Sequence, residues 1–183
     1  PLATLAATGR WSLLVRPAAD DPGRVERAAR AALRRWGVVF PKLLARDAQL
    51  PPWREMVVVL RRLEARGEIR GGRFVSLPSG EQFALPEAVE LLRAVRKEEP
   101  AGSLLSVSAA DPLNLSGLAV PGRRIPALAS HRLLWRDGDL VAALEAGRVE
   151  WLGDVPADAR WTAEKALRRG PIARPERLAR AAP

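Results

Sequence analysis

Apolar residues recur every three or four positions through the first part of the chain, which is the period of an amphipathic helix. The first of these segments, DDPGRVERAARAALRRWG (residues 20–37), predicts a helix. Asp21 is placed to cap its N-terminus, and Gly37 follows its last turn. Residues 41–47 predict a short second helix, and residues 50–67 predict a third helix that closes on Gly67. The expected apolar stripes are Val25, Ala29, Leu33 and Trp36 in the first helix and Trp53, Val57, Leu60 and Leu63 in the third.

Two short β-prone segments follow the third helix, in the stretch EIRGGRFVSL. Gly71 and Gly72 stand between them, and such a glycine pair favours a hairpin turn. Three helices followed by a hairpin are typical of a winged helix, in which the third helix enters the major groove of DNA and the hairpin forms a wing beside the backbone. Residues 21–85 therefore predict a winged-helix domain, with a basic packing module that binds no DNA as the alternative.

The apolar positions in the later part of the chain alternate with a period of two, as they do in strands. Turn signals at Asp137-Gly138 and Ala146-Gly147 separate three β-prone segments, and the stretches SLLSVS and SGLAV add two more. Residues 101–153 therefore predict a small antiparallel β-barrel or curled sheet. Together with the winged helix, this gives the whole chain an α+β fold.

Three further segments complete the organisation of the chain. Residues 86–100 predict a connector helix between two lobes, started by a proline. Residues 154–183 are rich in Ala, Arg and Pro and predict one or two helical turns followed by a loose tail, and residues 1–20 form an N-terminal segment. The apolar face of the connector is expected to be Val89, Leu92 and Val95.

The net charge of +9 is concentrated in one part of the chain. Residues 24–73 hold 13 Lys and Arg against 5 Asp and Glu, whereas residues 86–153 hold 8 against 9. A local positive field of this kind is typical of proteins with a polyanionic partner. The expected nucleic-acid contacts are the arginines on the polar side of the third helix and beside the turn of the wing: Arg54, Arg61, Arg62, Arg70 and Arg73.

Composition excludes several classes of site. The 183 residues contain no cysteine, which excludes disulfides, iron–sulfur clusters and thiolate zinc sites, and His131 is the only histidine. No metal and no other cofactor is therefore expected within this chain. No apolar stretch reaches the roughly 20 residues that span a bilayer and no signal peptide is visible, so we expect no membrane partner and a cytoplasmic location. Because the chain begins at Pro1, we expect it to be part of a longer protein.

Asp111 is the one ionisable residue in the apolar stretch LLSVSAADPLNLSGL, and Asn114 follows three positions later. An Asp before a proline commonly opens a turn, which the side chain of Asn114 would close. The alternative is a catalytic pair, in which the carboxylate stabilises positive charge on a sugar or activates water and the amide orients that water. We favour the turn and keep Asp111 and Asn114 as candidate catalytic residues.

Six tryptophans are candidates for stacking on unpaired bases, an interaction worth about 1–3 kcal/mol per base. Trp36 and Trp53 lie on the apolar stripes of predicted helices, so we expect both in the core. The remaining candidates are Trp11, Trp135, Trp151 and Trp161.

Five stretches of the chain together resemble one family: GRWSLL, RRWGVVFPKLLARD, PPWREMVVVLRRLEARGEIRGGRFV, SGEQFALPEAVELLR and SAADPLNLSG. They are similar, in order and with few gaps over about residues 9–153, to the C-terminal region of Lhr-type (large helicase-related) proteins. The resemblance implies a parent among the superfamily 2 ATP-dependent DNA helicases, which translocate 3′ to 5′ and carry a C-terminal region of winged helices and a β-barrel. That region resembles in architecture the winged-helix DNA glycosylases that act on damaged bases.

The motor of such a helicase has no counterpart in this sequence. The chain contains no G-x-x-x-x-G-K-[ST] loop and no acidic Walker B strand. Without a phosphate cradle and Mg²⁺ ligands it cannot hydrolyse ATP by itself. The resemblance therefore implies that ATP and Mg²⁺ belong to a motor elsewhere in the parent protein.

Three functions remain open on these grounds. The first is a nucleic-acid-binding accessory domain of an ATP-dependent 3′–5′ DNA helicase involved in DNA repair. Its partners would be single-stranded or tailed DNA, or an RNA–DNA hybrid, and the upstream helicase domains of the same protein. The second is a DNA glycosylase or glycosylase-like domain acting on damaged bases. The third is a free-standing winged-helix transcription regulator or a docking domain. We favour the first.

Overall fold

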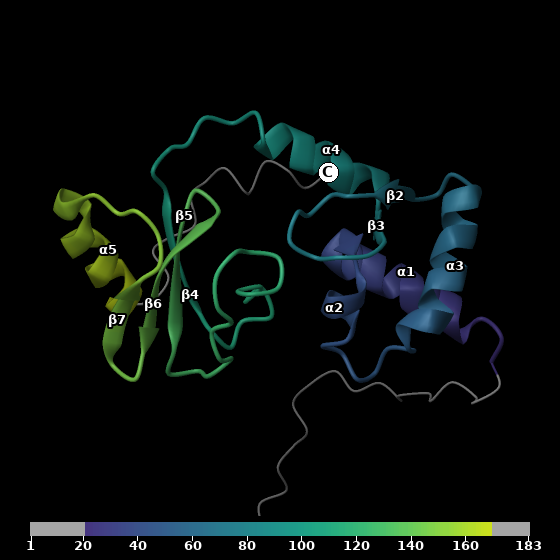
Figure 1. The fold of residues 1–183 in the computed structure, drawn as a ribbon, viewed down its shortest axis with the longest axis horizontal. Helices are drawn as coiled ribbons and strands as arrows, with labels where there is room; N and C mark the ends of the chain where they lie inside the picture. Colours follow the sequence, from purple (N-terminus) through teal and green to yellow (C-terminus); the bar gives the residue numbers. More distant parts are fainter. Residues whose placement is uncertain (1–20, 170–183) are drawn as a thin grey trace, which may run out of the picture.

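Two lobes joined by a helix make up the part of the chain that the structure describes, residues 21–169 of a computed structural model (Figure 1). The first lobe, residues 21–85, contains three helices and a small sheet, and the second contains a larger sheet and one helix. The expectations for residues 1–20, Trp11 among them, and for residues 170–183 lie outside the described residues.

The three helices of the first lobe are α1 (Arg24–Trp36), α2 (Pro41–Leu44) and α3 (Trp53–Ala65). They confirm the number and order that the apolar period predicts. The start of α1 differs from the expectation, because Gly23 is its N-cap. Asp21 lies outside the helix, where its Oδ1 accepts the N–H of Gly23 at 3.0 Å.

The buried face of α3 is rotated relative to the predicted stripe. Leu60 and Leu63 are buried as expected, whereas Trp53 and Val57 lie at the border of the core, partly buried. Trp36 also packs, partly buried, against this core, as its position on the stripe of α1 predicts. The core joins α1, α3 and the small sheet through Ala29, Ala32, Leu33, Val39, Leu44, Met56, Val59, Leu60, Leu63, Ile69 and Phe83.

The small sheet of the first lobe has three antiparallel strands: β1 (Val38–Val39), β2 (Arg70–Gly72) and β3 (Gln82–Ala84). Strand β3 lies between the other two. The glycine pair expected at the hairpin turn lies inside β2 instead, where Gly71 pairs with Phe83. The turn is a longer loop, and the positive φ that a turn requires is found at Gly80 (94°). We call residues 70–84, which comprise β2, this loop and β3, the wing.

A single helix, α4 (Pro86–Val95), connects the two lobes (Figure 1). At its start, the N–H of Leu85 donates to the carbonyl of Gly37 at 2.9 Å, which fastens the helix to the first lobe. Within the described structure no residue of α4 is buried; of its expected apolar face Val89 is partly buried, whereas Leu92 and Val95 are 42% and 55% exposed. The helix expected between the lobes is therefore present, with the C-terminal part of its apolar side in solvent.

The second lobe contains a four-stranded antiparallel sheet: β4 (Leu104–Ser108), β5 (Arg132–Arg136), β6 (Asp139–Glu145) and β7 (Arg148–Trp151), in that order. Both predicted turns are confirmed, and their first residues have the positive φ that two-residue hairpin turns need, 49° at Asp137 and 47° at Ala146. The barrel is not formed by the described residues, because the sheet is open. The strand expected at SGLAV is reduced to one bridge between Ser116 and Val120, so no fifth strand closes the sheet.

Both faces of this open sheet are covered. On one face α5 (Ala157–Arg169) packs through Ala163 and Leu167, and on the other the loop after β4 contributes Ala109 and Ile125. Burial from both sides explains why the middle of β6 reads LVAAL, a continuous apolar run. With 13 residues, α5 is longer than the one or two turns expected. None of the described helices combines the length and apolarity needed to cross a membrane.

Candidate nucleic-acid interface

The solvent side of α3 carries basic residues along one line. Arg54, Val58 and Arg61 follow one another at i, i+4 and i+7, opposite the buried face of the helix. The side chains of Arg54 and Arg61 are 82% and 60% exposed, and Val58 between them is 55% exposed. Residues at this spacing are neighbours on a helix surface, so the three form one ridge. The fold leaves this ridge of α3 open to a partner.

A buried glutamine shapes the wing. Gln82 is fully buried at the start of β3. Its Oε1 accepts the N–H groups of Phe74 and Val75 at 2.8 and 2.9 Å, and its Nε2 donates to the carbonyls of Val75 and Pro78 at 2.7 and 3.3 Å. One side chain thus satisfies four backbone groups of the wing loop, which fixes its shape without strand pairing. Sequence reasoning missed Gln82, because a polar residue in a β-prone segment is normally expected to face solvent.

Two contacts hold the wing against α3. The guanidinium of Arg61 donates to both carboxylate oxygens of Glu81, at 2.8 Å each. The carboxylate of Glu64 accepts the N–H of Gly71 at 3.1 Å, an approach that glycine permits because a Cβ at this position would collide with the carboxylate. Helix and wing therefore form one continuous surface. Since Arg61 and Glu81 are both largely exposed, their ion pair contributes only about 0–1 kcal/mol, and a phosphate can compete for the guanidinium.

The other arginines predicted as contacts are exposed around this surface. Arg70 lies on β2 and Arg73 directly follows it, both open to solvent. Arg62 flanks the ridge of α3. Within residues 21–169, no ion pair is formed by Arg62, Arg70 or Arg73, so their charges are available to a polyanion.

A network of ion pairs joins α1 to the end of α3. Arg30 donates to Glu26 at 2.8 Å and to Glu68 at 2.6 Å. These hydrogen bonds, with a smaller contribution from the charge of Arg66, hold the pKa of both carboxyls below the usual value. Arg30 and Arg66 are thus used within the lobe, whereas the ridge of α3 and the wing keep exposed arginines that a partner can reach.

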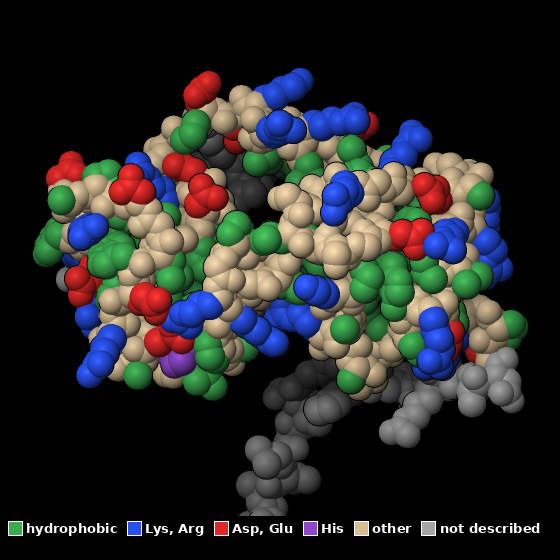
Figure 2. Space-filling model, in the orientation of Figure 1, with side chains coloured by type: hydrophobic (Ala, Val, Ile, Leu, Met, Phe, Trp, Pro, Cys, Tyr) green, Lys and Arg blue, Asp and Glu red, His purple; other side chains and the backbone are tan. Residues whose placement is uncertain are grey.

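Charge is distributed differently over the two lobes. In Figure 2 the first lobe and α4, on the right and at the top, show mainly Lys and Arg, whereas acidic side chains stand among the basic ones on the second lobe. The contrast agrees with the composition, since residues 24–73 carry 13 cations against 5 anions.

Asp111 lies on the loop between β4 and β5 and caps a turn there. Its Oδ1 accepts the N–H of Leu113 at 2.8 Å, and its carbonyl accepts the N–H of Asn114 at 2.9 Å. This is the side-chain turn that an Asp before a proline predicts. The carboxylate is thus held by the backbone of its own loop.

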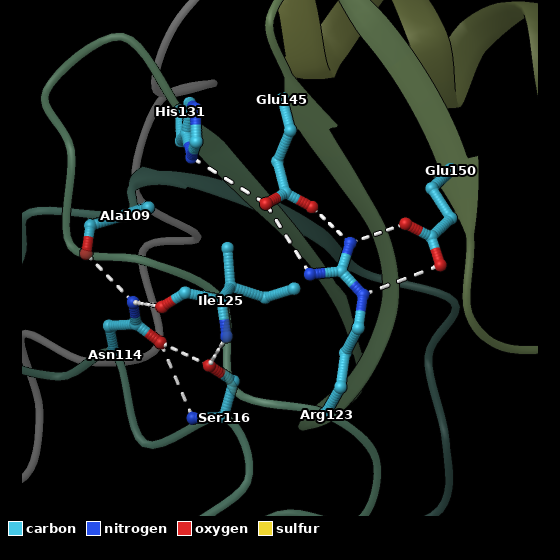
Figure 3. Close-up of polar contacts among 8 residues, drawn as sticks. All are labelled: Ala109, Asn114, Ser116, Arg123, Ile125, His131, Glu145 and Glu150. Atoms are coloured by element: carbon cyan, nitrogen blue, oxygen red, sulfur yellow. Dashed lines mark hydrogen bonds and ion pairs between the residues drawn. The ribbon is translucent and has the colours of Figure 1, made fainter.

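Asn114 is 5% exposed, and its whole amide is engaged in the same loop (Figure 3). Its Nδ2 donates to the carbonyls of Ala109 and Ile125 at 2.8 and 3.0 Å. Its Oδ1 accepts the N–H and the hydroxyl of Ser116 at 3.3 and 2.6 Å, and that hydroxyl accepts the N–H of Ile125 at 2.9 Å. In this arrangement the amide has no capacity left to orient water. The structure brings Asp111 and Asn114 together as parts of one folded loop.

A cluster of charges that sequence reasoning missed lies beside this loop (Figure 3). Arg123 donates to Glu145 on β6 and to Glu150 on β7. The hydrogen bond from Arg123 holds the pKa of Glu145 below its usual 4.5. His131 is mostly buried, and its Nδ1 lies 3.7 Å from the carboxylate of Glu145. No local motif marks this cluster, because its members lie far apart in the sequence.

One hydrogen bond links the loop directly to the first lobe. The guanidinium of Arg46, which follows α2, donates to the carbonyl of Asn114 at 3.0 Å. Arg46 and Pro112 also border the same surface hollow between the lobes. The loop that Asn114 folds therefore contributes to the junction of the two lobes.

Comparison with known proteins gives two matches. The family model described as "Large helicase-related protein, winged-helix domain" matches residues 18–104. The chain is also 30% identical over 122 residues to the Lhr helicase/uracil glycosylase of Escherichia coli (strain K12). That match covers 65% of this chain and 8% of the relative, so the chain spans a small part of the relative's length. Both findings confirm the resemblance seen in the sequence.

Proposed function

We propose, from the premise that residues 18–104 contain a winged-helix domain of the large helicase-related type, that this chain is a nucleic-acid-binding accessory domain. Its parent protein is an ATP-dependent 3′–5′ DNA helicase that works in DNA repair. The chain holds single-stranded or tailed DNA near the motor and contacts the upstream helicase domains. Hydrolysis of ATP, with Mg²⁺, takes place in the motor.

The joint surface of α3 and the wing is the observation that carries the proposal. The ridge of α3 and the wing are held side by side by the pair of Arg61 with Glu81. In a winged helix these two elements are the ones that lie on DNA. Phosphate contacts supply much of the affinity of such domains, and exposed arginines are suited to making them. We therefore expect binding that depends little on base sequence.

Base excision is not favoured for this chain. The name of the relative includes uracil glycosylase, but the match spans 8% of that protein. Here the carboxylate of Asp111 caps a turn and the amide of Asn114 is fully bonded. A free-standing regulator is not favoured either, because the matched domain belongs to helicase-related proteins.

Two double variants test the proposal: Arg61→Ala with Arg62→Ala, and Arg70→Ala with Arg73→Ala. Fluorescence anisotropy with labelled duplexes of several sequences should show each variant binding about tenfold more weakly, whatever the sequence, because each removes two potential phosphate contacts. Thermal melts should change little, since the removed side chains are exposed.

The matched control is Arg124→Ala with Arg148→Ala, which removes the same charge from exposed positions of the second lobe. Its affinity for duplex should stay close to that of the unmodified chain. Unchanged affinity in both first-lobe variants, or an equal loss in the control, would show that the surface of α3 and the wing does not bind duplex.

A further inference from the structure

The most exposed large apolar side chain among the described residues lies outside the winged helix. Trp161, on α5, is 70% exposed. The opposite side of α5 packs on the sheet through Ala163, Ala166 and Leu167, so Trp161 points away from the core. A tryptophan in solvent forgoes the large stabilisation that burial of its ring provides.

The other tryptophans of the described residues differ from Trp161. Trp36 and Trp53 pack against the core of the first lobe, and Trp135 and Trp151 pack against the two clusters of the second lobe, all partly buried. Their rings thus contribute to packing. Trp161 alone among these five side chains offers an indole that the described core does not use.

Basic side chains accompany Trp161 on the same side of α5. The Nζ of Lys165, one turn further along, lies 4.7 Å from the centre of the Trp161 ring. Arg168 follows at the next turn and forms an ion pair with Glu164 at 2.9 Å. All four side chains, those of Trp161, Glu164, Lys165 and Arg168, border one surface hollow. The side chains of Arg168 and Glu164 are 49% and 45% exposed. Because an exposed ion pair is weak, a phosphate can compete with Glu164 for the guanidinium.

We propose that Trp161, Lys165 and Arg168 form a second nucleic-acid contact, in which the indole stacks on an unpaired base and the two cations meet the adjoining phosphates. Every nucleobase has a π-face, so an exposed aromatic ring flanked by positive charge binds single strands with little regard to sequence. The inference rests on the proposed function and deepens it. The winged helix takes the duplex part of a tailed substrate, and α5 takes the single strand.

The test is the affinity of the 183-residue chain for labelled oligothymidine and oligouridine, measured by anisotropy. Trp161→Ala should weaken binding about fivefold or more on at least one of the two strands, which is the loss expected for one stacked base. Trp161→Phe, which keeps an aromatic face, should stay much closer to the unmodified chain. Leu91→Ala is the matched control, because Leu91 is a 58% exposed apolar residue of α4, and it should not change affinity.

A second readout reports on stacking directly. Part of the quenching of tryptophan fluorescence by oligothymidine should disappear in Trp161→Phe, while the variant still binds. Unchanged affinity of Trp161→Ala on both strands, or unchanged quenching in Trp161→Phe, would overturn the proposal and leave Trp161 as a contact for protein.

Failure of this inference is distinguishable from failure of the proposed function. Trp161→Ala should bind blunt duplex as the unmodified chain does, whereas the arginine variants of α3 and the wing should lose duplex affinity. If only the arginine variants lose affinity, the winged-helix interface stands and the contact on α5 is wrong. If only Trp161→Ala loses affinity, the contact on α5 stands and the winged-helix interface is wrong.

Discussion

In the first lobe the basic residues of α3 and the wing lie in solvent, whereas in the second lobe the amide of Asn114 is buried within the loop between β4 and β5. Arg62, Arg70 and Arg73 form no ion pair with any described residue. By contrast, Asn114 is 5% exposed and Arg123 is bound by two carboxylates. Unpaired charge on the surface makes a field that acts on a partner, and paired or buried polar groups hold the fold itself. The comparison therefore supports the proposal that the first lobe binds the duplex, and it gives the loop of the second lobe a structural role.

Core substitutions give the largest expected effect and test whether the two lobes are separate units. Leu60 and Leu133 are both fully buried, one in each lobe. Leu60→Ala and Leu133→Ala should each destabilise their own lobe by about 2–5 kcal/mol, because each leaves a cavity. Hydrogen exchange resolved by peptide should show reduced protection confined to the substituted lobe. Only Leu60→Ala should lower duplex affinity. Reduced protection in both lobes of either variant would mean that the lobes fold as one unit.

Asn114→Ala should have the next largest effect, about 2–4 kcal/mol of stability, measured by urea unfolding. The substitution leaves the buried carbonyls of Ala109 and Ile125 without their donor, and each unsatisfied group is worth about 1–3 kcal/mol. Asp111→Asn is the matched control and should change stability little, because an oxygen acceptor for Leu113 remains. Asp111→Ala should cost about 1 kcal/mol. Equal stabilities of Asn114→Ala and Asp111→Asn would contradict the structural role of the amide.

The ion pairs of Glu145 give the smallest expected effect, which depends on pH. Because Arg123 lowers the folded-state pKa of Glu145 below 4.5, the pair stabilises the lobe fully above that pH and is lost as pH falls through the lower folded value. Glu145→Gln should therefore be less stable than the unmodified chain near neutral pH, by less than about 1 kcal/mol, and equally stable at strongly acid pH. Urea midpoints of both proteins at the two pH values measure this. A difference that persists in acid would assign the effect to packing.

The sequence predicted the elements that depend on local signals. The apolar period identified the three helices of the first lobe, and the Asp137-Gly138 and Ala146-Gly147 turns identified three of the four strands of the open sheet. The exposed arginines of α3 and the wing were also predictable, because charge on a helix face opposite an apolar stripe stays in solvent.

The features that the sequence did not predict depend on specific side-chain contacts rather than on a periodic pattern. Gln82 shapes the wing by bonding a loop four to eight positions away, and Gly71, expected at the turn, allows β2 to approach Glu64. The partners of Arg123 lie 22 and 27 positions from it. Of the two forms expected for the second lobe, the antiparallel sheet is present and open, and the closed barrel is wrong. The stretch SGLAV forms one bridge and no strand, and its backbone is bonded by Asn114 and Ser116 instead. Such side-chain contacts leave no periodic trace in one sequence, whether the partners are near or far along the chain.

The salt dependence of duplex binding tests most directly the claim that phosphate contacts of the first lobe carry the affinity. The logarithm of the association constant is measured against the logarithm of salt concentration for the unmodified chain and for Arg70→Ala with Arg73→Ala. We predict a linear fall for both, with a slope shallower by about 1.8 in the double variant, about 0.9 for each phosphate that the variant no longer neutralises. Equal slopes in the two proteins would contradict the account.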